Sequence, residues 1–296
     1  MAREHIQVLR KMLQSDRGVI LPGAPNALAA RVVADLGFSA VYLTGAGLTN
    51  TLLGLPDLGF LDLSQVTEHT MAIRGVVDLP LVVDADTGFG NALNVSHTVR
   101  ALERAGASAV QLEDQRAPKR CGHFDGKELI VADEMVSEMV SKIKAAVDSR
   151  REDVVVIART DACAVEGFEA AIERAGRYID AGADMTFVEA PNSLEELKEI
   201  PKRLRAPQLL NIVLGGKTPI VDRKSCEDMG YSFVLYANAA LQGMLLGMRT
   251  ALRTLREKGV LDERDSCIAS FAERQRLVGK EKFDEMERSY AHSSRT

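Results

Sequence analysis

The chain has 296 residues, of which 46% are hydrophobic, and a formal net charge of −5. This length suits one α/β barrel or two smaller domains, with enough apolar side chains for a large core. A mildly acidic chain without basic tracts argues against nucleic-acid binding. A local cluster of Arg and Lys can still bind an anionic substrate.

The four cysteines are widely spaced and form no CxxC pair, which is typical of proteins in a reducing compartment. The N-terminus lacks the apolar segment of a signal peptide. No apolar run approaches the length of a membrane span. We therefore expect a cytoplasmic protein that binds neither a membrane nor nucleic acid.

Eight short apolar segments predict strands that are buried on both faces, as in a parallel sheet. They are Gly18–Leu21, Ala40–Thr44, Leu81–Ala85, Ala109–Glu113, Val154–Ala158, Met185–Glu189, Gln208–Ile212 and Phe233–Tyr236. Apolar residues at helical spacing predict helices over Pro25–Gly37, Leu63–Val76, Ala92–Ala105, Ala132–Ser149, Phe168–Ala181, Leu194–Leu204 and Asp222–Met229. This alternation favours a (β/α)8 TIM barrel, with a doubly wound sheet as the competing arrangement.

The chain continues well beyond the eighth predicted strand. After Asn238 the pattern predicts a helix to about Lys258, and helical patterning returns from Asp265 to about Tyr290. We predict one barrel domain over residues 1–296, with residues 239–296 as a C-terminal helical extension. These helices are expected to pack outside the barrel or on a neighbouring subunit.

The predicted C-terminal ends of the strands are unusually polar, and this end forms the active site of a barrel. Any one of these residues can simply cap the next helix, but the whole set points to a bound cation and an anionic ligand. Asp84 and Asp86 are two positions apart and point the same way on a regular strand, and Glu113 ends the next strand. Oxygen ligands of this kind suit Mg2+ or Mn2+.

The segment Pro118–Lys127 follows the fourth strand and places Cys121 next to Lys119, Arg120 and His123. Positive neighbours lower the pKa of a thiol, so we predict a functional role for Cys121. A polar loop with two glycines is suited to close over a bound substrate. Thr44–Gly47 reads as a turn of small residues whose backbone N–H groups can bind a carboxylate or a phosphate.

Five segments together resemble the isocitrate lyase and phosphoenolpyruvate mutase superfamily, over about residues 21–238. They are Gly54–Asp57, Asp84–Gly90, Leu112–Gln115, Lys119–His123 and Ile157–Ala162. The Lys-Arg-Cys-Gly-His loop looks like that of the 2-methylisocitrate lyases. Carboxyphosphonoenolpyruvate phosphonomutases carry a very similar loop.

The resemblance implies a Mg2+-dependent barrel, usually a homotetramer whose C-terminal helices are exchanged between subunits. Carried over by position, Asp84, Asp86 and Glu113 would surround the metal, some of them through water. Asp57 would support this site.

The resemblance also implies roles for the loop and for the strand ends. Cys121 would protonate the carbanion-like product, and Lys119 and His123 would tune the thiol. Substrate contacts are expected from Thr44, Gly45 and Ala46 at the carboxylate of the 2-oxo product, from Arg159, Glu189 and Asn211 at the far side, and from Tyr42, Arg120 and Gly122.

The implied reaction is a retro-aldol type cleavage of the C2–C3 bond in a small 2-hydroxy di- or tricarboxylate. One departure from the family pattern is Leu214, which stands where a Glu is common after strand seven. The apolar side chain disfavours a tricarboxylate of the usual kind. Three alternatives stay open: phosphonate chemistry as a mutase or phosphonopyruvate-acting enzyme, oxaloacetate decarboxylation or hydrolysis, and a non-catalytic protein that binds a 2-oxo acid.

Overall fold

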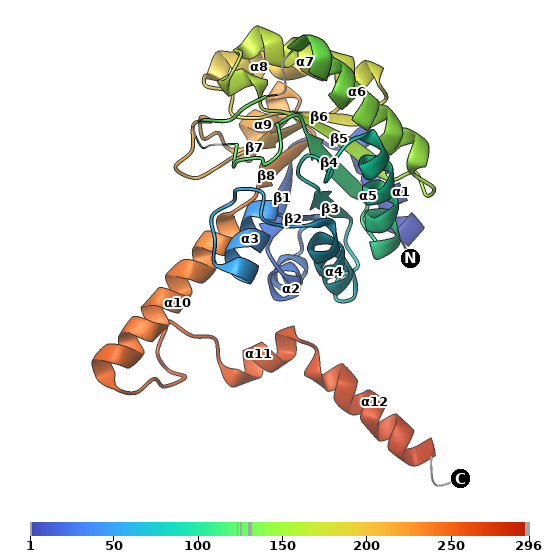
Figure 1. The fold of residues 1–296 in the computed structure, drawn as a ribbon. Helices are drawn as coiled ribbons and strands as arrows, with labels where there is room; N and C mark the ends of the chain where they lie inside the picture. Colours follow the sequence, from blue (N-terminus) through green and yellow to red (C-terminus); the bar gives the residue numbers. More distant parts are fainter. Residues whose placement is uncertain (1, 123, 125, 130–131, 294–296) are drawn as a thin grey trace. The chain divides into compact units, whose positions relative to one another are not determined.

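The computed structural model describes residues 2–122, 124, 126–129 and 132–293. Its eight parallel strands close into a barrel in chain order, and the last strand pairs with the first (Figure 1). The strands are β1 Val19–Ala24, β2 Val41–Leu43, β3 Leu81–Asp84, β4 Ala109–Glu113, β5 Val155–Thr160, β6 Met185–Val188, β7 Gln208–Asn211 and β8 Phe233–Tyr236. The predicted TIM barrel is confirmed, and the doubly wound sheet is excluded by this closure.

Helices follow the strands and cover the outside of the barrel (Figure 1). They are α2 Ala27–Asp35, α3 Gly45–Leu53, α4 Leu63–Arg74, α5 Ala92–Ala105, α6 Ala132–Ser149, the 3-10 turn η1 Ala162–Ala164, α7 Phe168–Asp180, α8 Leu194–Arg203 and α9 Arg223–Met229. Side-chain caps fix several starts: Asn26 accepts from the amide of Ala29, so α2 begins two residues after the predicted Pro25. Asp222 likewise caps α9.

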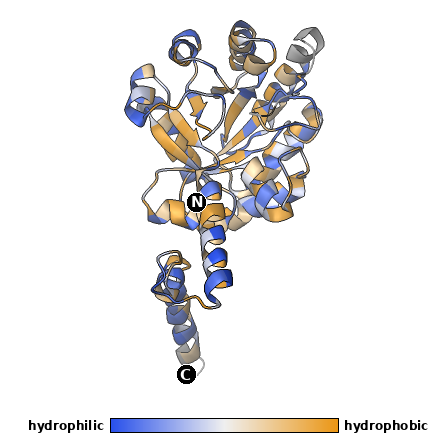
Figure 2. Ribbon diagram, turned by 90° about the vertical axis from the view of Figure 1, so that its left-hand side faces the viewer, coloured by the Kyte–Doolittle hydropathy of each residue, from blue (hydrophilic) through white to orange (hydrophobic). Residues whose placement is uncertain are grey.

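The strands are apolar on both faces because one face fills the barrel and the other meets the helices. Figure 2 shows them as mainly hydrophobic ribbons. Every residue of β3, β4 and β5 is buried, including the acidic residues that end β3 and β4. Burying ionised groups is costly unless they are paired, so these strand ends need partners at the mouth of the barrel.

An N-terminal helix, α1 Ala2–Ser15, was not expected from the sequence. Its residues Leu9, Met12 and Leu13 belong to the same core cluster as Ala109 and Val155, which begin two of the strands. The helix therefore closes the N-terminal end of the barrel with apolar side chains, and the opposite end is left for the polar residues.

The segment Thr44–Gly47 is not a simple turn, as the sequence suggested, but the start of α3. Thr44 is the N-cap, and its side-chain oxygen accepts from the amide of Gly47 at 3.2 Å. Gly54, at φ +67°, ends the helix in the left-handed conformation that favours glycine. Backbone N–H groups of Gly45 and Ala46 thus lie at a helix N-terminus, which retains the predicted preference for an anion.

The chain divides into two compact units, Met1–Ala239 and Ala240–Thr296. Beyond the barrel lie α10 Ala239–Lys258, which matches the prediction, then α11 Phe271–Leu277 and α12 Lys280–Ser293. The helical patterning expected from Asp265 to about Tyr290 is found from Phe271 onward, in two helices: Ser270 caps α11, and Gly279, at φ +72°, separates α11 from α12. In the described part of the chain, no helix has both the length and the apolar character needed to cross a membrane.

Candidate active site

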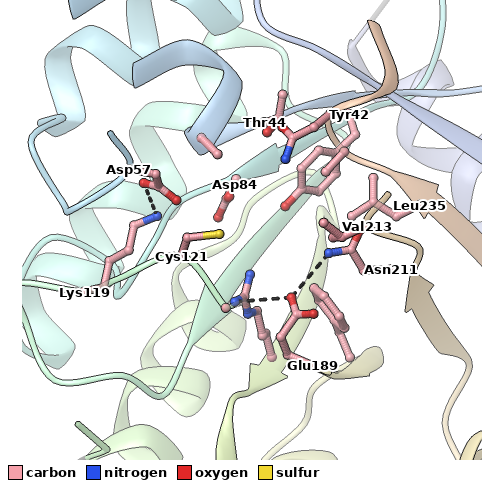
Figure 3. A pocket seen from close by; sticks show the side chains of 16 residues that line it. Tyr42, Thr44, Asp57, Asp84, Lys119, Cys121, Glu189, Asn211, Val213 and Leu235 are labelled. Carbon is pink, nitrogen blue, oxygen red and sulfur yellow. Dashed lines mark hydrogen bonds and ion pairs between the residues drawn. The ribbon is translucent and has the colours of Figure 1, made fainter. Parts of the chain in front are cut away.

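A cavity lies among the polar strand ends (Figure 3). Its lining residues are Tyr42, Thr44, Ala46, Asp57, Asp84, Lys119, Cys121, Gly122, Arg159, Phe187, Glu189, Asn211, Val213, Leu235, Ala237 and Asn238. Most of the residues predicted from the sequence are therefore brought to a single place, although they are spread over the chain from Tyr42 to Asn211.

Asp84 and Asp86 converge on the start of α3. The amide of Gly45 donates to Oδ2 of Asp84 at 3.3 Å, and Gln111 Nε2 donates to Oδ1 at 3.2 Å. A Cβ atom at Gly45 would lie 3.0 Å from Asp84 Oδ2 and 3.3 Å from Asp86 Oδ1. The glycine therefore allows both carboxylates to approach the helix backbone closely.

Lys119 is a buried lysine that bridges two acids. Its Nζ lies 2.7 Å from Asp57 Oδ1 and 2.9 Å from Asp86 Oδ1. Burial opposes the charged form, but the surrounding acids, Asp86 first, hold the pKa of Lys119 well above its usual value. Burial also raises the pKa of Asp86, and Lys119 limits that rise, to about 6. The lysine thus neutralises part of the acidic cluster.

Arg159, at the end of β5, gathers three acids on the other side of the cavity. Its Nε lies 3.3 Å from Glu113 Oε2 and 2.9 Å from Asp161 Oδ2, and its Nη2 lies 3.2 Å from Glu189 Oε2. Asn211 Nδ2 donates to the same Glu189 oxygen at 3.4 Å (Figure 3). Burial keeps the pKa of Glu113 well above its ordinary range despite the nearby Arg159.

The predicted metal ligands do not form a closed cluster. Within the residues that the structure describes, no three His, Cys, Asp or Glu side chains lie close enough together to hold a metal ion alone. Glu113 faces Arg159, but among the described residues its buried Oε1 has no hydrogen-bond partner. Mg2+ usually keeps several waters and takes only one or two carboxylates directly, so direct bonds to one or two of Asp84, Asp86 and Glu113, with water reaching the others, fit such an ion.

Cys121 is half-buried and is not in a disulfide. Figure 3 shows its Sγ directed into the cavity that Asp84 also faces. The amide of Cys121 donates to the carbonyl of Asp57 at 3.2 Å, which fastens the thiol-bearing loop to the loop after α3. The thiol therefore lies inside the site, as the sequence predicted for a functional cysteine.

Two predicted residues of the same loop are placed differently. Arg120 does not line this cavity: its backbone amide donates to Gln115 Oε1 at 2.9 Å, and it lines a separate cavity with Arg116 and Glu128. It follows Lys119 directly, and neighbouring residues of an extended loop point to opposite sides. His123 lies outside the described residues, so its predicted role as a partner of the thiol stays a prediction.

A second cavity continues outward from the first and shares Cys121 and Val213 with it. Leu214 and Phe124, each 44% exposed, line it together with Ala46. Lys217 also lines this outer cavity. Val213, Leu214 and Phe124 thus form an apolar part of the outer cavity, which Asn50, Asp57 and Asn238 also line.

Several site residues were not singled out by the sequence analysis. Asp161, which is fully buried, binds Arg159 with both carboxylate oxygens, at 2.9 and 3.0 Å. Gln111 binds both Asp84 and the hydroxyl of Tyr42, the latter at 3.1 Å. Lys127, with a side chain only 2% exposed, contacts Asp161. For Asp161, its position directly after a predicted strand is the one feature of the sequence that could have marked it as a site residue. The burial of Lys127 depends on tertiary packing and leaves no such mark in the sequence.

A closed barrel whose mouth gathers carboxylates, an arginine and a thiol around one cavity has the layout of an enzyme active site. Residues 9–256 match the family described as phosphoenolpyruvate phosphomutase, and the chain belongs to this family. It thereby belongs to the isocitrate lyase and phosphoenolpyruvate mutase superfamily, as the sequence motifs implied.

Relatives with assigned activities cover most of the chain. It is 47% identical to 2-methylisocitrate lyase of Aeropyrum pernix, over 85% of this chain and 80% of that protein. It is 40% identical to 2,3-dimethylmalate lyase of Eubacterium barkeri, over 96% and 97% of the two chains. Among solved structures, oxaloacetate acetylhydrolase with bound 3,3-difluorooxalacetate has a TM-score of 0.91 at 32% identity, covering 98% of each chain.

Proposed function

We propose that this protein is a Mg2+-dependent carbon–carbon bond lyase that cleaves a 2-hydroxy di- or tricarboxylate of the alkylmalate or 2-methylisocitrate type. The products would be a 2-oxo acid, pyruvate or glyoxylate, and a second carboxylate such as succinate. Relatives at 40% and 47% identity named as lyases support this class of reaction. The observation that carries the proposal is that Cys121, Asp84 and Arg159 line the same cavity.

Asp84, Asp86 and Glu113 would hold the metal, with water completing its coordination. Bound there, Mg2+ or Mn2+ would polarise the substrate oxygens and lower the pKa of the 2-hydroxyl group. Oxygen donors of this kind suit these hard cations rather than zinc. The unpartnered Oε1 of Glu113 supports this assignment, because a buried acceptor without a donor is costly.

The remaining site residues would bind and orient the substrate. The N-terminus of α3 offers the amide of Ala46, and that of Gly45 if it exchanges Asp84 for the substrate; the helix dipole favours the carboxylate of the 2-oxo acid half. Arg159 supplies positive charge on the opposite side, and Glu189 and Asn211 stand next to it. An anionic substrate thus finds donors at both ends of the cavity.

Cys121 would act as the general acid. After a base takes the 2-hydroxyl proton, the electrons of the C2–C3 bond move to C3, which becomes an enolate-like carboxylate. The thiol gives its proton to C3, and the resulting thiolate is reprotonated from solvent. The nearby Lys119 ammonium would stabilise the thiolate. Closing the loop over this intermediate would exclude the water that otherwise quenches it.

The apolar outer cavity favours an alkyl substituent at C3 of the substrate. Val213 and Leu214 present side chains that match a methyl or ethyl group better than a third carboxylate. A tricarboxylate would have to use Lys217 at the same outer wall. We therefore place a dialkylmalate ahead of 2-methylisocitrate as the substrate.

The C-terminal unit supports a homo-oligomer, and we propose a homotetramer in which these helices pack on a neighbouring subunit. Leu245, Leu246, Met248 and Leu252 of α10 are each more than half exposed in the single chain. A helix with such a face gains stability when another subunit covers it. Light scattering coupled to gel filtration tests the assembly. A monomer at micromolar concentration would contradict it.

The test of the function is an assay for pyruvate and glyoxylate release. The panel contains 2,3-dimethylmalate, 2-methylisocitrate, isocitrate, oxaloacetate and phosphonopyruvate, each with Mg2+ and with excess EDTA. We expect Mg2+-dependent release of 2-oxo acid from an alkylmalate or 2-methylisocitrate. Oxalate and acetate are assayed separately for oxaloacetate: their release would favour the hydrolase, which the 32% identical structure supports, whereas release of pyruvate would favour decarboxylation. Turnover of phosphonopyruvate would favour phosphonate chemistry, and binding without turnover would leave a 2-oxo acid binding protein.

A further inference from the structure

Lys127 is a buried lysine that the proposed reaction does not use. Its side chain is 2% exposed, and its Nζ donates to Asp161 Oδ1 at 3.0 Å and to the carbonyl of Gly122 at 2.5 Å. A buried ammonium is tolerated where it is paired and hydrogen-bonded. Lys127 therefore binds two specific groups: first the carbonyl of Gly122 on its own loop, and second the carboxylate of Asp161, which directly follows β5.

The first group is next to the proposed acid. Gly122 follows Cys121 directly, and a Cβ atom at Gly122 would lie 2.3 Å from Arg159 Nη2 and 2.6 Å from Glu189 Cγ. The backbone of the loop is thus pressed against the side chains of β5 and β6 without room for a side chain. Since Lys127 binds the carbonyl of Gly122, it helps to fix the residue that follows Cys121.

The second group is a rigid anchor. Asp161 binds Arg159 through both oxygens, and its own amide donates to Asp114 Oδ1 at 2.9 Å. Burial alone would raise the pKa of Asp161, but Arg159 and then Lys127 bring it down to about 2. The carboxylate is therefore ionised and held by two cations, while the backbone of Asp161 is held by Asp114. Lys127 binds the same carboxylate as Arg159, so the two side chains are held in a fixed position relative to each other.

We propose that Lys127 is a positioning residue that couples the Cys121 loop to Arg159 through Asp161. The Lys127 ammonium binds the carbonyl of Gly122, next to Cys121, and also the Asp161 carboxylate that orients Arg159. The thiol and the guanidinium are thereby held in one geometry around the substrate. This role deepens the proposed function and rests on it, because it assumes that Cys121 delivers a proton to the substrate bound in this cavity.

The test replaces Lys127 and measures where the loop lies, independently of turnover. Lys127→Met removes the ammonium but keeps a long side chain, and Lys127→Arg keeps the charge. Lys224→Met is the matched control, because Lys224 is 69% exposed on α9 and pairs with Asp228 there. The probe is the rate at which iodoacetamide alkylates Cys121, with and without Mg2+ and oxalate, a planar dianion that resembles the enolate of a 2-oxo acid. Peptide mass spectrometry follows each cysteine, and Cys267 in the C-terminal unit is the internal reference.

We expect Mg2+ and oxalate to slow alkylation of Cys121 by about tenfold or more in the unmodified protein and in Lys224→Met, because a closed site excludes the reagent. In Lys127→Met the protection should fall to about threefold or less. Its kcat should drop about 10–100-fold with a much smaller change in KM, since the thiol is misplaced while the binding groups remain. Lys127→Arg should restore most of the protection.

Wild-type protection in Lys127→Met, with or without a loss of kcat, would overturn the proposal. If Lys127→Met fails to fold, Asp161→Asn removes the charge of the anchor at constant size and must cause the same loss of protection. Wild-type protection of Cys121 from alkylation in Asp161→Asn would also overturn the proposal. Failure of the proposed function is distinguishable: the unmodified protein would then show no lyase turnover, while the effect of Lys127 on Cys121 protection would still be measured.

Discussion

The Nζ atom of Lys119 lies 2.9 Å from Oδ1 of Asp86, a carboxylate that we also assign to the metal site. The ammonium and a divalent ion therefore compete for the same oxygen. Two cations that share one carboxylate oxygen would repel each other strongly in a buried site. Binding of Mg2+ at Asp86 would therefore require Lys119 to give up part of its contact with that carboxylate.

From this competition we predict that Lys119→Met raises the affinity for Mg2+ in the absence of substrate. Removal of one buried positive charge should lower the Kd for the metal by about tenfold, which corresponds to roughly 1.4 kcal/mol. Isothermal titration with Mg2+ measures this change, and the exposed Lys224→Met serves as a control for net charge. Turnover of the same variant should fall, because the thiol loses its positive neighbour. Weaker Mg2+ binding would show instead that the ammonium organises the carboxylates.

A second prediction concerns the thiol itself. Cys121→Ser and Cys121→Ala should lower kcat by roughly 10²–10⁴-fold, the usual scale for loss of a general acid. KM should change little, because the groups that hold the substrate are unaltered. Steady-state kinetics on the best substrate of the panel measure both constants, and Cys267→Ala is the matched control outside the barrel. Near wild-type turnover in the Cys121 variants would show that Cys121 is not the general acid.

The barrel and the acidic cluster were predictable because they follow from local patterns. Continuously apolar strands that alternate with helices specify a parallel sheet, and the carboxyl ends of such strands meet at one mouth. Asp84 and Glu113 end neighbouring strands, so their place at the mouth of the barrel needed no knowledge of loops. The same reasoning placed Arg159 and Glu189 correctly at the cavity.

Other features depend on contacts that the linear pattern does not contain. Two glycines in Gly45–Leu53 disfavour a helix by propensity, and the cap at Thr44 together with burial overrides this. Arg120 was assigned to the site by its place beside Cys121, but the course of the loop turns it away. Lys127 looks like any exposed lysine, and its burial follows from Asp161, which lies 34 positions further on.

The third prediction tests the apolar wall of the outer cavity. Leu214→Asn should lower kcat/KM for 2,3-dimethylmalate by about tenfold or more, because an alkyl group then meets an amide; contacts of one alkyl group contribute roughly 10–200-fold to selectivity. Leu214→Met preserves an apolar surface of similar size and should stay within about threefold of the original value. Kinetics on 2,3-dimethylmalate and 2-methylisocitrate in parallel give the ratio. An equal loss for both substrates would mean that Leu214 does not select the C3 substituent.

The last prediction uses the two buried cysteines of the barrel. Burial, and then the nearby Glu196, raise the pKa of Cys163 to about 12, and burial raises the pKa of Cys226 to about 11. A raised thiol pKa favours the neutral form, so at pH 8 the thiolate is only about one part in 10⁴ for Cys163 and one part in 10³ for Cys226. Since the thiolate is the nucleophile, both should react with iodoacetamide far more slowly than Cys267. The rate at Cys226 should rise about tenfold per pH unit up to its pKa.

Peptide mass spectrometry between pH 7 and 9.5 measures these rates on the folded protein, and alkylation in guanidinium chloride, where all four cysteines should react, is the control. The steep dependence on pH separates an electrostatic effect from simple lack of access, which would slow the reaction equally at every pH. If Cys163 reacted as fast as Cys267 at pH 8, the packing of η1 against α8, where its Sγ lies 3.9 Å from Glu196 Oε2, would not describe the protein in solution.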